Sequence, residues 1–363
     1  MQAKEVFQNM TPYKPGKQIE EVKKEFGLSQ IVKLASNENP FGYSEQVKQA
    51  IPNMLDGLEI YPDGYATALR EKLATLLEVD KDQLIFGAGS DEVIAFICST
   101  YLKQGTNTIM ATPTFPQYKH NALIQGADIV EVPLVDGYHD LDAMLKKVNK
   151  ETRVIWLCSP NNPTGSLISK ERLVSFLDQC SSSTLVVLDE AYYEYIEQDK
   201  NPNSISLLKE YENLVVLRTF SKAYGLANLR VGYGVAASKE IATLLNITRG
   251  PFNTTSISQL SAVKALEDQA FIEKSHKETV QNKHAFMKFC DENGLQYYDS
   301  QANFLFVKLP TSGDQLFEYL LRHGYIVRSG EAIEHPKGVR ITIGSKEHME
   351  ELQQLITSFL ATK

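Results

Sequence analysis

The feature that most constrains this fold is a series of short apolar segments, separated by stretches with helical periodicity. The apolar segments are rich in Val, Ile and Leu: Leu84–Phe86, Thr108–Ala111, Ile129–Val132, Val154–Leu157, Leu185–Leu188 and Leu214–Leu217. They do not alternate strictly with polar residues, which is typical of strands buried on both faces. The helical stretches between them are Asp91–Tyr101, Leu141–Lys147, Lys170–Gln179 and Ile205–Glu210. This alternation predicts an α/β fold with a mostly parallel mixed sheet flanked by helices.

The pattern changes after about residue 258. Gln259 to Asn293 predicts one long, charged helix that ends at Gly294, and shorter helical and strand-like segments follow. The N-terminal segment contains Pro12, Pro15, Gly16, Pro40 and Gly42, so we expect it to be extended and to wrap over another part of the chain. We therefore expect a large domain over residues 45–258. A smaller α+β domain would combine residues 1–44 with residues 259–363.

Composition excludes several functions. The 363 residues include 37 Lys and Arg against 45 Asp and Glu, so the net charge of −8 gives no sign of a nucleic-acid-binding surface. The four cysteines have no CxxC spacing and the seven histidines form no HxH or HExxH motif, so we expect neither a metal site nor a disulfide scaffold. No apolar run approaches the roughly 18 residues that span a bilayer. We expect a cytoplasmic protein without a membrane partner.

A glycine-rich turn follows the first predicted strand and opens the next helix. Its sequence is Gly87-Ala88-Gly89-Ser90-Asp91-Glu92. Glycines let a backbone approach a ligand closely, and a helix N-terminus presents free N–H groups to an anion. The same residues also fit a tight turn in which Ser90 or Asp91 caps the helix. No Gly-Lys-Ser/Thr follows, so this is not a Walker A loop.

Three further polar clusters lie directly after predicted strands. They are SPNNPTG at residues 159–165, DEAY at residues 189–192 and RTFSKAYGLANLRVG at residues 218–232. Open α/β sheets bind ligands at the carboxyl ends of their strands. Asp189 at such an end is either a helix cap or a functional carboxylate. Lys222 follows an apolar strand, so it is a candidate for a buried amine whose lowered pKa makes it a nucleophile.

Together and in this order, the clusters resemble the cofactor motifs of the pyridoxal-phosphate (PLP) aminotransferases of fold type I, in their aspartate-aminotransferase-like branch. The resemblance covers nearly the whole chain. It implies that Lys222 holds PLP as a Schiff base and moves a proton between the substrate α-carbon and the cofactor C4′. Asp189 would pair with the protonated pyridine nitrogen. Asn162 and Tyr192 would hydrogen-bond the ring 3′-oxygen, and Lys222, Asp189 and Tyr192 form the implied catalytic set.

The resemblance also implies how the rest of the cofactor is bound. Phe115 would stack on the ring, at a position where a Tyr is common in the family. The residues implied at the cofactor phosphate are Gly89, Ser90, Asp91, Thr219, Ser221 and Arg230. Tyr61, in Ile60-Tyr61-Pro62, matches a tyrosine that reaches this phosphate from the neighbouring subunit. The implied active enzyme is therefore a homodimer.

Four more segments resemble the histidinol-phosphate aminotransferases: MTPYKPGK at residues 10–17, LASNENPFG at 34–42, YIVR at 325–328 and VRITIG at 339–344. That family exchanges an amino group between L-histidinol phosphate and 2-oxoglutarate, a step of histidine biosynthesis that yields L-glutamate. Arginine's planar guanidinium suits both a phosphate and a carboxylate. The implied substrate-binding residues are Tyr13, Asn37, Tyr61, Asn162, Arg328 and Arg340.

Three other functions stay open on the sequence alone. An aromatic amino-acid aminotransferase would share these motifs. A threonine-phosphate decarboxylase of the same fold would keep the lysine, the aspartate and the phosphate-binding arginines but release CO2. A PLP-sensing or nucleotide-binding module would use the turn at residues 87–91 without catalysis. The intact set of Lys222, Asp189 and Arg230 favours an enzyme over the last of these.

Overall fold

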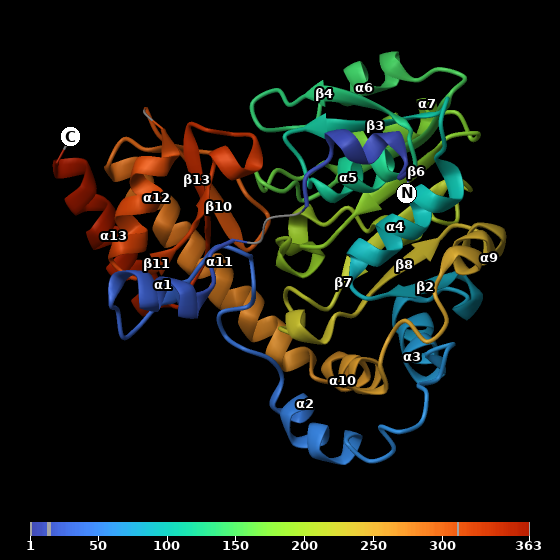
Figure 1. Ribbon diagram of the computed structural model, residues 1–363, viewed down its shortest axis with the longest axis horizontal. Coiled ribbons are helices and arrows are strands. Elements are labelled where there is room, and N and C mark those ends of the chain that lie inside the picture. Colours follow the sequence, from blue (N-terminus) through green and yellow to red (C-terminus); the bar gives the residue numbers. More distant parts are fainter. Residues whose placement is uncertain (1, 13–15, 311, 363) are drawn as a thin grey trace.

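A seven-stranded sheet lies in the right-hand part of the computed structural model as drawn in Figure 1, and the structure describes residues 2–12, 16–310 and 312–362. The strands are β2 (Leu84–Gly87), β3 (Asn107–Thr112), β4 (Asp128–Pro133), β5 (Thr152–Cys158), β6 (Leu185–Asp189), β7 (Leu214–Thr219) and β8 (Gly232–Ala236). Their order is β2-β8-β7-β6-β5-β3-β4. Neighbours from β7 to β4 pair in parallel, whereas β8 is antiparallel to both β7 and β2. The predicted α/β class, the mostly parallel mixed sheet and its six predicted strands are confirmed.

Strand β8 is the one that the sequence pattern did not predict. It contains Gly232 and Gly234, and glycine is depleted in strands. A side chain on Gly232 would collide with a neighbour, and one on Gly234 would make a tight contact. A Cβ on Gly232 would lie 2.4 Å from the Ser90 nitrogen, and one on Gly234 would lie 3.2 Å from Leu217 Cδ2. Close packing against its neighbours, rather than the strand propensity of its residues, explains why this segment contains two glycines.

Helices cover both faces of the large sheet because alternate strand residues are apolar on each side. In β5, Ile155 and Leu157 belong to one core, and Val154 and Trp156 belong to the other. The first core is covered by α2 (Glu45–Ala50), α3 (Thr67–Leu77), α6 (Leu141–Lys147), α7 (Lys170–Gln179) and α10 (Ser256–Glu267). The second is covered by α4 (Ser90–Tyr101), α5 (Gln117–Ile124) and α9 (Lys239–Thr248). Within the described ranges, no helix is long and apolar enough to cross a membrane.

A second, antiparallel sheet has the order β12-β13-β10-β9. Its strands are β9 (Gln296–Tyr297), β10 (Phe304–Lys308), β12 (Arg328–Ser329) and β13 (Gly338–Thr342). It packs against α11 (Gln269–Glu292), α12 (Gly313–Arg322) and α13 (Lys346–Ala361) through a core of its own. A separate pairing joins β1 (Val32–Lys33) in parallel to β11 (Tyr325–Ile326), so the N-terminal segment is attached beside this sheet.

Two helix predictions were wrong. The predicted single helix from residue 259 to 293 is two helices, α10 and α11, that meet at Asp268. This carboxylate accepts the Phe271 N–H at 3.2 Å and the Ser44 hydroxyl at 2.5 Å, so it caps α11 rather than continuing α10. The predicted helix Ile205–Glu210 is the single turn α8 (Ser204–Leu207).

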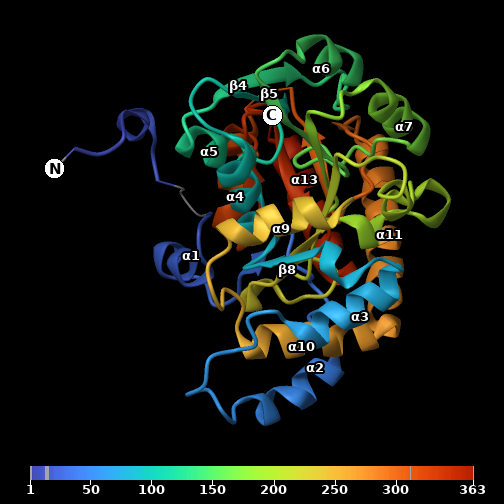
Figure 2. The same cartoon turned by 90° about the vertical axis from the view of Figure 1, so that its right-hand side faces the viewer.

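The N-terminal segment is extended only in part. It also forms α1 (Ile19–Phe26) and α2, and a short 3-10 helix, η1 (Glu5–Asn9). Helix α1 is stabilised by a capping box between Gln18 and Glu21, a local signal that the prolines on either side obscured. Residues 2–12 lie beside α5 and extend away from the body of the molecule (Figure 2).

Candidate active site

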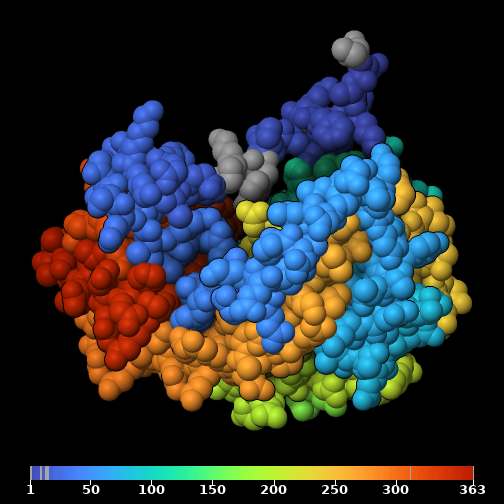
Figure 3. All heavy atoms as spheres, turned by 90° about the horizontal axis from the view of Figure 1, so that it is seen from below, coloured from blue at the N-terminus to red at the C-terminus, as the bar shows by residue number. Residues whose placement is uncertain are grey.

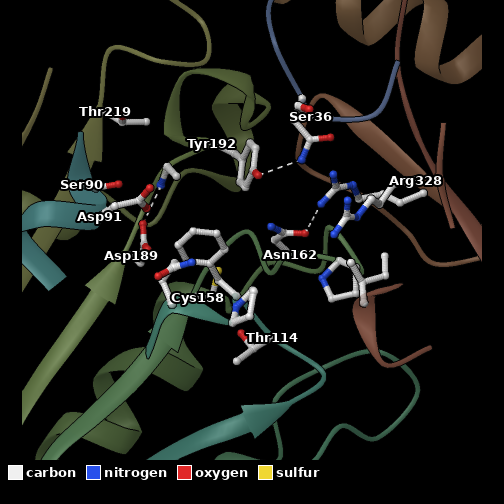
Figure 4. A pocket seen from close by; sticks show the side chains of 18 of the residues that line it. Ser36, Ser90, Asp91, Thr114, Cys158, Asn162, Asp189, Tyr192, Thr219 and Arg328 are labelled. Atoms are coloured by element: carbon white, nitrogen blue, oxygen red, sulfur yellow. Dashed lines mark hydrogen bonds between the residues drawn. The ribbon is translucent and has the colours of Figure 1, made fainter. Parts of the chain in front are cut away.

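A pocket of about 490 Å3 lies at the carboxyl ends of β3, β5, β6 and β7, facing β12 and β13. Strand β2 also ends there, because two successive antiparallel pairings through β8 align it with β7. Figure 4 shows Ser90, Asp91 and Thr219 on one side of the pocket and Asn162 and Arg328 on the other. The predicted site residues that line it are Asn37, Gly89, Ser90, Asp91, Phe115, Asn162, Asp189, Tyr192, Thr219, Ser221, Lys222, Arg230, Arg328 and Arg340.

Two predicted residues are not among those that line it. Tyr13 lies outside the described residues. The side chain of Tyr61 is 79% exposed and stacks on Phe252, with ring centroids 4.8 Å apart, on the outer surface. Within one chain, Tyr61 is therefore not part of the pocket.

The amine of Lys222 lies inside the pocket, in the turn after β7. Its Nζ donates a hydrogen bond to the Ser36 carbonyl oxygen at 2.9 Å. Desolvation in the pocket, together with the positive charge of Arg340, lowers the pKa of Lys222 to about 8. The turn requires Gly225, which has φ 71° and lies so close to the Gly42 carbonyl oxygen that a Cβ would be 1.9 Å from it. Because its pKa is lowered, more of the Lys222 amine is uncharged near neutral pH than in an ordinary lysine, and the uncharged amine can act as a nucleophile.

The carboxylate of Asp189 lies at the end of β6 and is only 2% exposed. Burial raises its pKa to about 6. Two donors oppose this effect: the Tyr118 hydroxyl at 2.6 Å and the Ala191 N–H at 3.2 Å. Tyr118 is fully buried and stacks on Trp156, with ring centroids 4.7 Å apart. Sequence reasoning missed Tyr118, because no local pattern brings a residue of α5 to the end of β6.

Anion-binding groups gather at the N-terminus of α4. Gly89 has φ 83°, and a Cβ there would lie 2.5 Å from Arg230 Nη2, so only glycine lets the guanidinium approach this turn. Arg230 Nη1 donates to Ser221 Oγ at 3.3 Å, and Nη2 lies 3.8 Å from Asp91 Oδ2. With the free N–H groups of the helix and the Thr219 hydroxyl, they form a cup suited to a phosphate.

The opposite end of the pocket carries two arginines because β12 and β13 pair with Arg328 directly across from Arg340. Arg340 is buried and donates to Asn162 Oδ1 and to the Ala35 carbonyl oxygen. Beside it, Asn37 Nδ2 donates to the Tyr192 hydroxyl at 2.9 Å, and burial raises the pKa of that phenol. Asn37 thus connects the N-terminal segment to the centre of the site.

The donor set fits one kind of cofactor. The cup at Arg230 can hold a phosphate, the amine of Lys222 can form a covalent bond to an electrophilic carbon, and Asp189 can hold a proton on a ring nitrogen. Phe115 and Tyr192 contribute aromatic surface between the two polar ends. Among the described residues, no group of three or more His, Cys, Asp or Glu side chains is arranged to hold a metal ion.

Known proteins share this architecture. The family model for aminotransferase class I and II matches residues 29–358. Histidinol-phosphate aminotransferase from Geobacillus sp. (strain WCH70) is 54% identical over 363 residues, covering 100% of this chain and 99% of the relative. Histidinol-phosphate aminotransferase from Sinorhizobium meliloti, solved in complex with pyridoxal-5′-phosphate, has a TM-score of 0.89 at 26% identity and covers 98% of each chain.

One solved structure in the same fold has a different name. L-threonine-O-3-phosphate decarboxylase from Porphyromonas gingivalis has a TM-score of 0.78 at 22% identity, covering 91% of this chain and 100% of its own. At that identity it shares only the fold. The family match, the identity over the full chain and the pocket agree: the chain belongs to the class I and II aminotransferases and, within them, to the histidinol-phosphate aminotransferase family.

Proposed function

We propose that this chain is a PLP-dependent aminotransferase that moves an amino group between L-histidinol phosphate and 2-oxoglutarate, forming L-glutamate, in histidine biosynthesis. The observation that carries the proposal is the arrangement of one pocket. Its reactive amine, Lys222, and buried carboxylate, Asp189, lie between an anion-binding cup at Arg230 and a second cationic end at Arg328 and Arg340. Two cationic ends suit a phosphate-bearing cofactor and an anionic substrate bound together.

Each cofactor-facing residue has a distinct task in this proposal. Bound PLP supplies an electron sink for the substrate α-carbon. Lys222 first holds the cofactor and then, as a free amine, carries the proton at the substrate α-carbon. Asp189 keeps a proton on the ring nitrogen. The Tyr192 hydroxyl accepts a hydrogen bond from Asn37, and the side-chain oxygen Oδ1 of Asn162 accepts one from Arg340. The Tyr192 O–H and the side-chain N–H groups of Asn162 therefore remain available to donate to the ring oxygen.

The substrate end must accept a phosphate from one substrate and carboxylates from the other. Arg340 is held rigid by two hydrogen bonds and is nearly buried, so its charge acts in a partly desolvated site. Arg328 is half-exposed and contributes a second guanidinium from the paired strand. We assign the substrate phosphate and the distal carboxylate to these two residues, with Asn37 and Tyr13 beside them.

The active form in this proposal is a homodimer in the cytoplasm. The segment that crosses α10 exposes the large apolar side chains of Leu55, Leu58, Ile60, Tyr61 and Tyr65, and Phe252 adds to this surface through its stack on Tyr61 (Figure 3). Exposed apolar surface of this kind is typical of protein–protein interfaces. Tyr61 in this surface would reach the cofactor phosphate of the second copy. All four cysteines are free, as a reducing compartment favours.

A spectral titration tests the proposed function. The PLP-loaded protein should change its absorbance when L-histidinol phosphate is added and recover when 2-oxoglutarate follows. Lys222→Ala should lose both the covalent cofactor link and turnover, while Lys209→Ala, a surface lysine, should behave as the wild type. No spectral change with histidinol phosphate would remove the substrate assignment. Near-normal turnover of Lys222→Ala would refute the assigned amine.

The same assay separates the alternatives. A faster rate with phenylalanine than with histidinol phosphate would identify an aromatic amino-acid aminotransferase. Release of CO2 without any requirement for a keto acid would identify a decarboxylase. We expect neither, because the family match over the full chain supports the histidinol-phosphate substrate.

A further inference from the structure

A buried lysine lies outside the pocket. Lys283, on α11, is 1% exposed, although its side chain ends in an amine. Its Nζ donates to the Ser300 carbonyl oxygen at 2.6 Å and to the Ala302 carbonyl oxygen at 3.2 Å. Burial lowers its pKa to about 8. Burying an amine is unfavourable unless it is well hydrogen-bonded, so we looked for what this contact organises.

The carbonyls belong to residues 300–303, which we call the bridge segment. This segment contacts the Asn162 turn on the large sheet. The Gln301 N–H donates to the Gly165 carbonyl oxygen at 2.8 Å, and Gly165 N–H closes the turn by donating to the Asn161 carbonyl oxygen at 2.6 Å. A Cβ on Gly165 would lie 2.1 Å from Ser300 Oγ, so the two backbones are packed as closely as glycine allows. The bridge segment therefore determines where Asn162 lies.

The bridge segment also contacts the substrate end of the site. Asn303 Nδ2 donates to the Asn37 carbonyl oxygen at 3.1 Å, and the Asn303 carbonyl oxygen accepts the Ile343 N–H at 2.9 Å. Ile343 follows β13, the strand that carries Arg340. Asn37 in turn donates to Tyr192. The same four residues thus contact both the turn that carries Asn162 and the segments that carry Asn37 and Arg340.

We propose that Lys283 is a positioning residue for the reaction: by holding the bridge segment, it sets the spacing between Asn162 on the large sheet and Asn37 and Arg340 at the substrate end. Two neighbouring buried carbonyl groups repel each other unless a donor lies between them, and the amine is that donor. This inference rests on the proposed function, because it takes Arg340 and Asn37 as substrate-binding residues. Lys283 itself touches neither substrate nor cofactor.

The test compares Lys283→Met with Lys283→Arg. The methionine keeps the aliphatic volume and removes the donor, while the arginine keeps a cationic donor. Lys288→Met is the matched control, since Lys288 lies on the same helix but is exposed and forms an ion pair with Glu292 at 3.7 Å. Calorimetry would measure the binding of glutarate, an unreactive dicarboxylate, to the PLP-loaded protein, and absorbance would measure PLP affinity.

Lys283→Met should weaken glutarate binding at least tenfold and raise KM for both substrates at least fivefold, with smaller changes in kcat and in PLP affinity. Lys283→Arg should recover most of this loss, and Lys288→Met should stay within twofold of the wild type. Asn303→Ala breaks the same connection without changing the buried amine, so it should also weaken glutarate binding. The double variant Lys283→Met/Asn303→Ala should be little worse than the worse single variant, because both act through one chain of contacts.

Two results would overturn the inference alone. One is a Lys283→Met protein that binds glutarate within twofold of the wild type. The other is a Lys283→Met protein whose affinities for PLP and for glutarate fall equally, while Asn303→Ala binds both as the wild type does. This result would indicate a general loss of folding. A wild-type protein that binds no glutarate would instead overturn the assignment of the substrate end in the proposed function, and this inference with it.

Discussion

Replacing Tyr118 with Phe should change the ionisation of Asp189, the carboxylate assigned to the cofactor ring nitrogen. The substitution removes a single group from the side chain. The Phe ring can keep its stack on Trp156, and only the hydroxyl 2.6 Å from Asp189 Oδ2 is lost. The remaining donor within reach is the Ala191 N–H at 3.2 Å. Because Asp189 is buried, water compensates poorly for the missing hydrogen bond.

The size of the effect follows from the strength of that hydrogen bond. A hydrogen bond to a charged group contributes about 1.5–3 kcal/mol. At about 1.36 kcal/mol per pH unit, its loss should raise the pKa of Asp189 by about one to two pH units. Burial already holds this pKa at about 6, above the ordinary value for Asp. The variant carboxyl should therefore bind a proton near neutral pH, where the wild-type group is mostly ionised.

The assay is the affinity for PLP between pH 5 and pH 9, followed by absorbance. A protonated Asp189 cannot stabilise a positive ring nitrogen, so wild-type affinity should fall as the pH drops through about 6. In Tyr118→Phe the midpoint of this fall should move up by about one to two pH units. The cofactor's own ionisations affect both proteins equally, so the difference between the two curves is the measurement.

Tyr211→Phe is the matched control, because Tyr211 donates a bond of similar length, 2.7 Å, to Asp178 at the surface. It should leave the curve unchanged. Equal midpoints for wild type and Tyr118→Phe would refute the reasoning.

Three further predictions follow from buried groups and from the proposed dimer. Both ring nitrogens of His139 are buried with no hydrogen-bond partner in the described part of the chain, and burial lowers its pKa to about 4. Because the folded state disfavours a proton on His139, the free energy of unfolding should be unaffected by this group above pH 6.5 and should fall by about 3 kcal/mol towards pH 4. Urea unfolding at several pH values would measure this fall, which the variant His139→Leu should lack. Arg218→Met should destabilise the fold by about 3–5 kcal/mol in the same assay, because it leaves the buried Glu190 carboxylate without the guanidinium it pairs with. Adding Glu190→Gln to this variant should restore part of the lost free energy of unfolding. Mixing Tyr61→Phe chains with Lys222→Ala chains should regain activity over either variant alone; no gain would contradict a site shared between subunits.

Strands β2, β3, β5, β6 and β7 could be predicted because strands buried on both faces are composed almost entirely of apolar residues. Residues 154–157 are apolar on both faces, and the structure assigns alternate members to two separate cores. Strand β8 could not be predicted in this way. Its Gly232 is required by the backbone at the start of α4, which is distant in sequence, and its Gly234 packs closely against a leucine of β7. The break at Asp268 was missed as well: the carboxylate that caps α11 also accepts a hydrogen bond from Ser44, which lies 224 residues away in the sequence.

The sequence by itself predicted which residues would carry the chemistry. Turns at strand ends require glycine, proline and polar residues at particular positions, so they leave recognisable sequence motifs. These motifs contain Lys222, Asp189 and Arg230. Only the tertiary structure decided how these groups behave. Tyr118 and Lys283 act through contacts at the end of a strand and at the bridge segment, to which their own sequence neighbourhoods give no clue. The pKa values of buried groups depend on the desolvation and charges around them, and those exist only after distant segments have packed together.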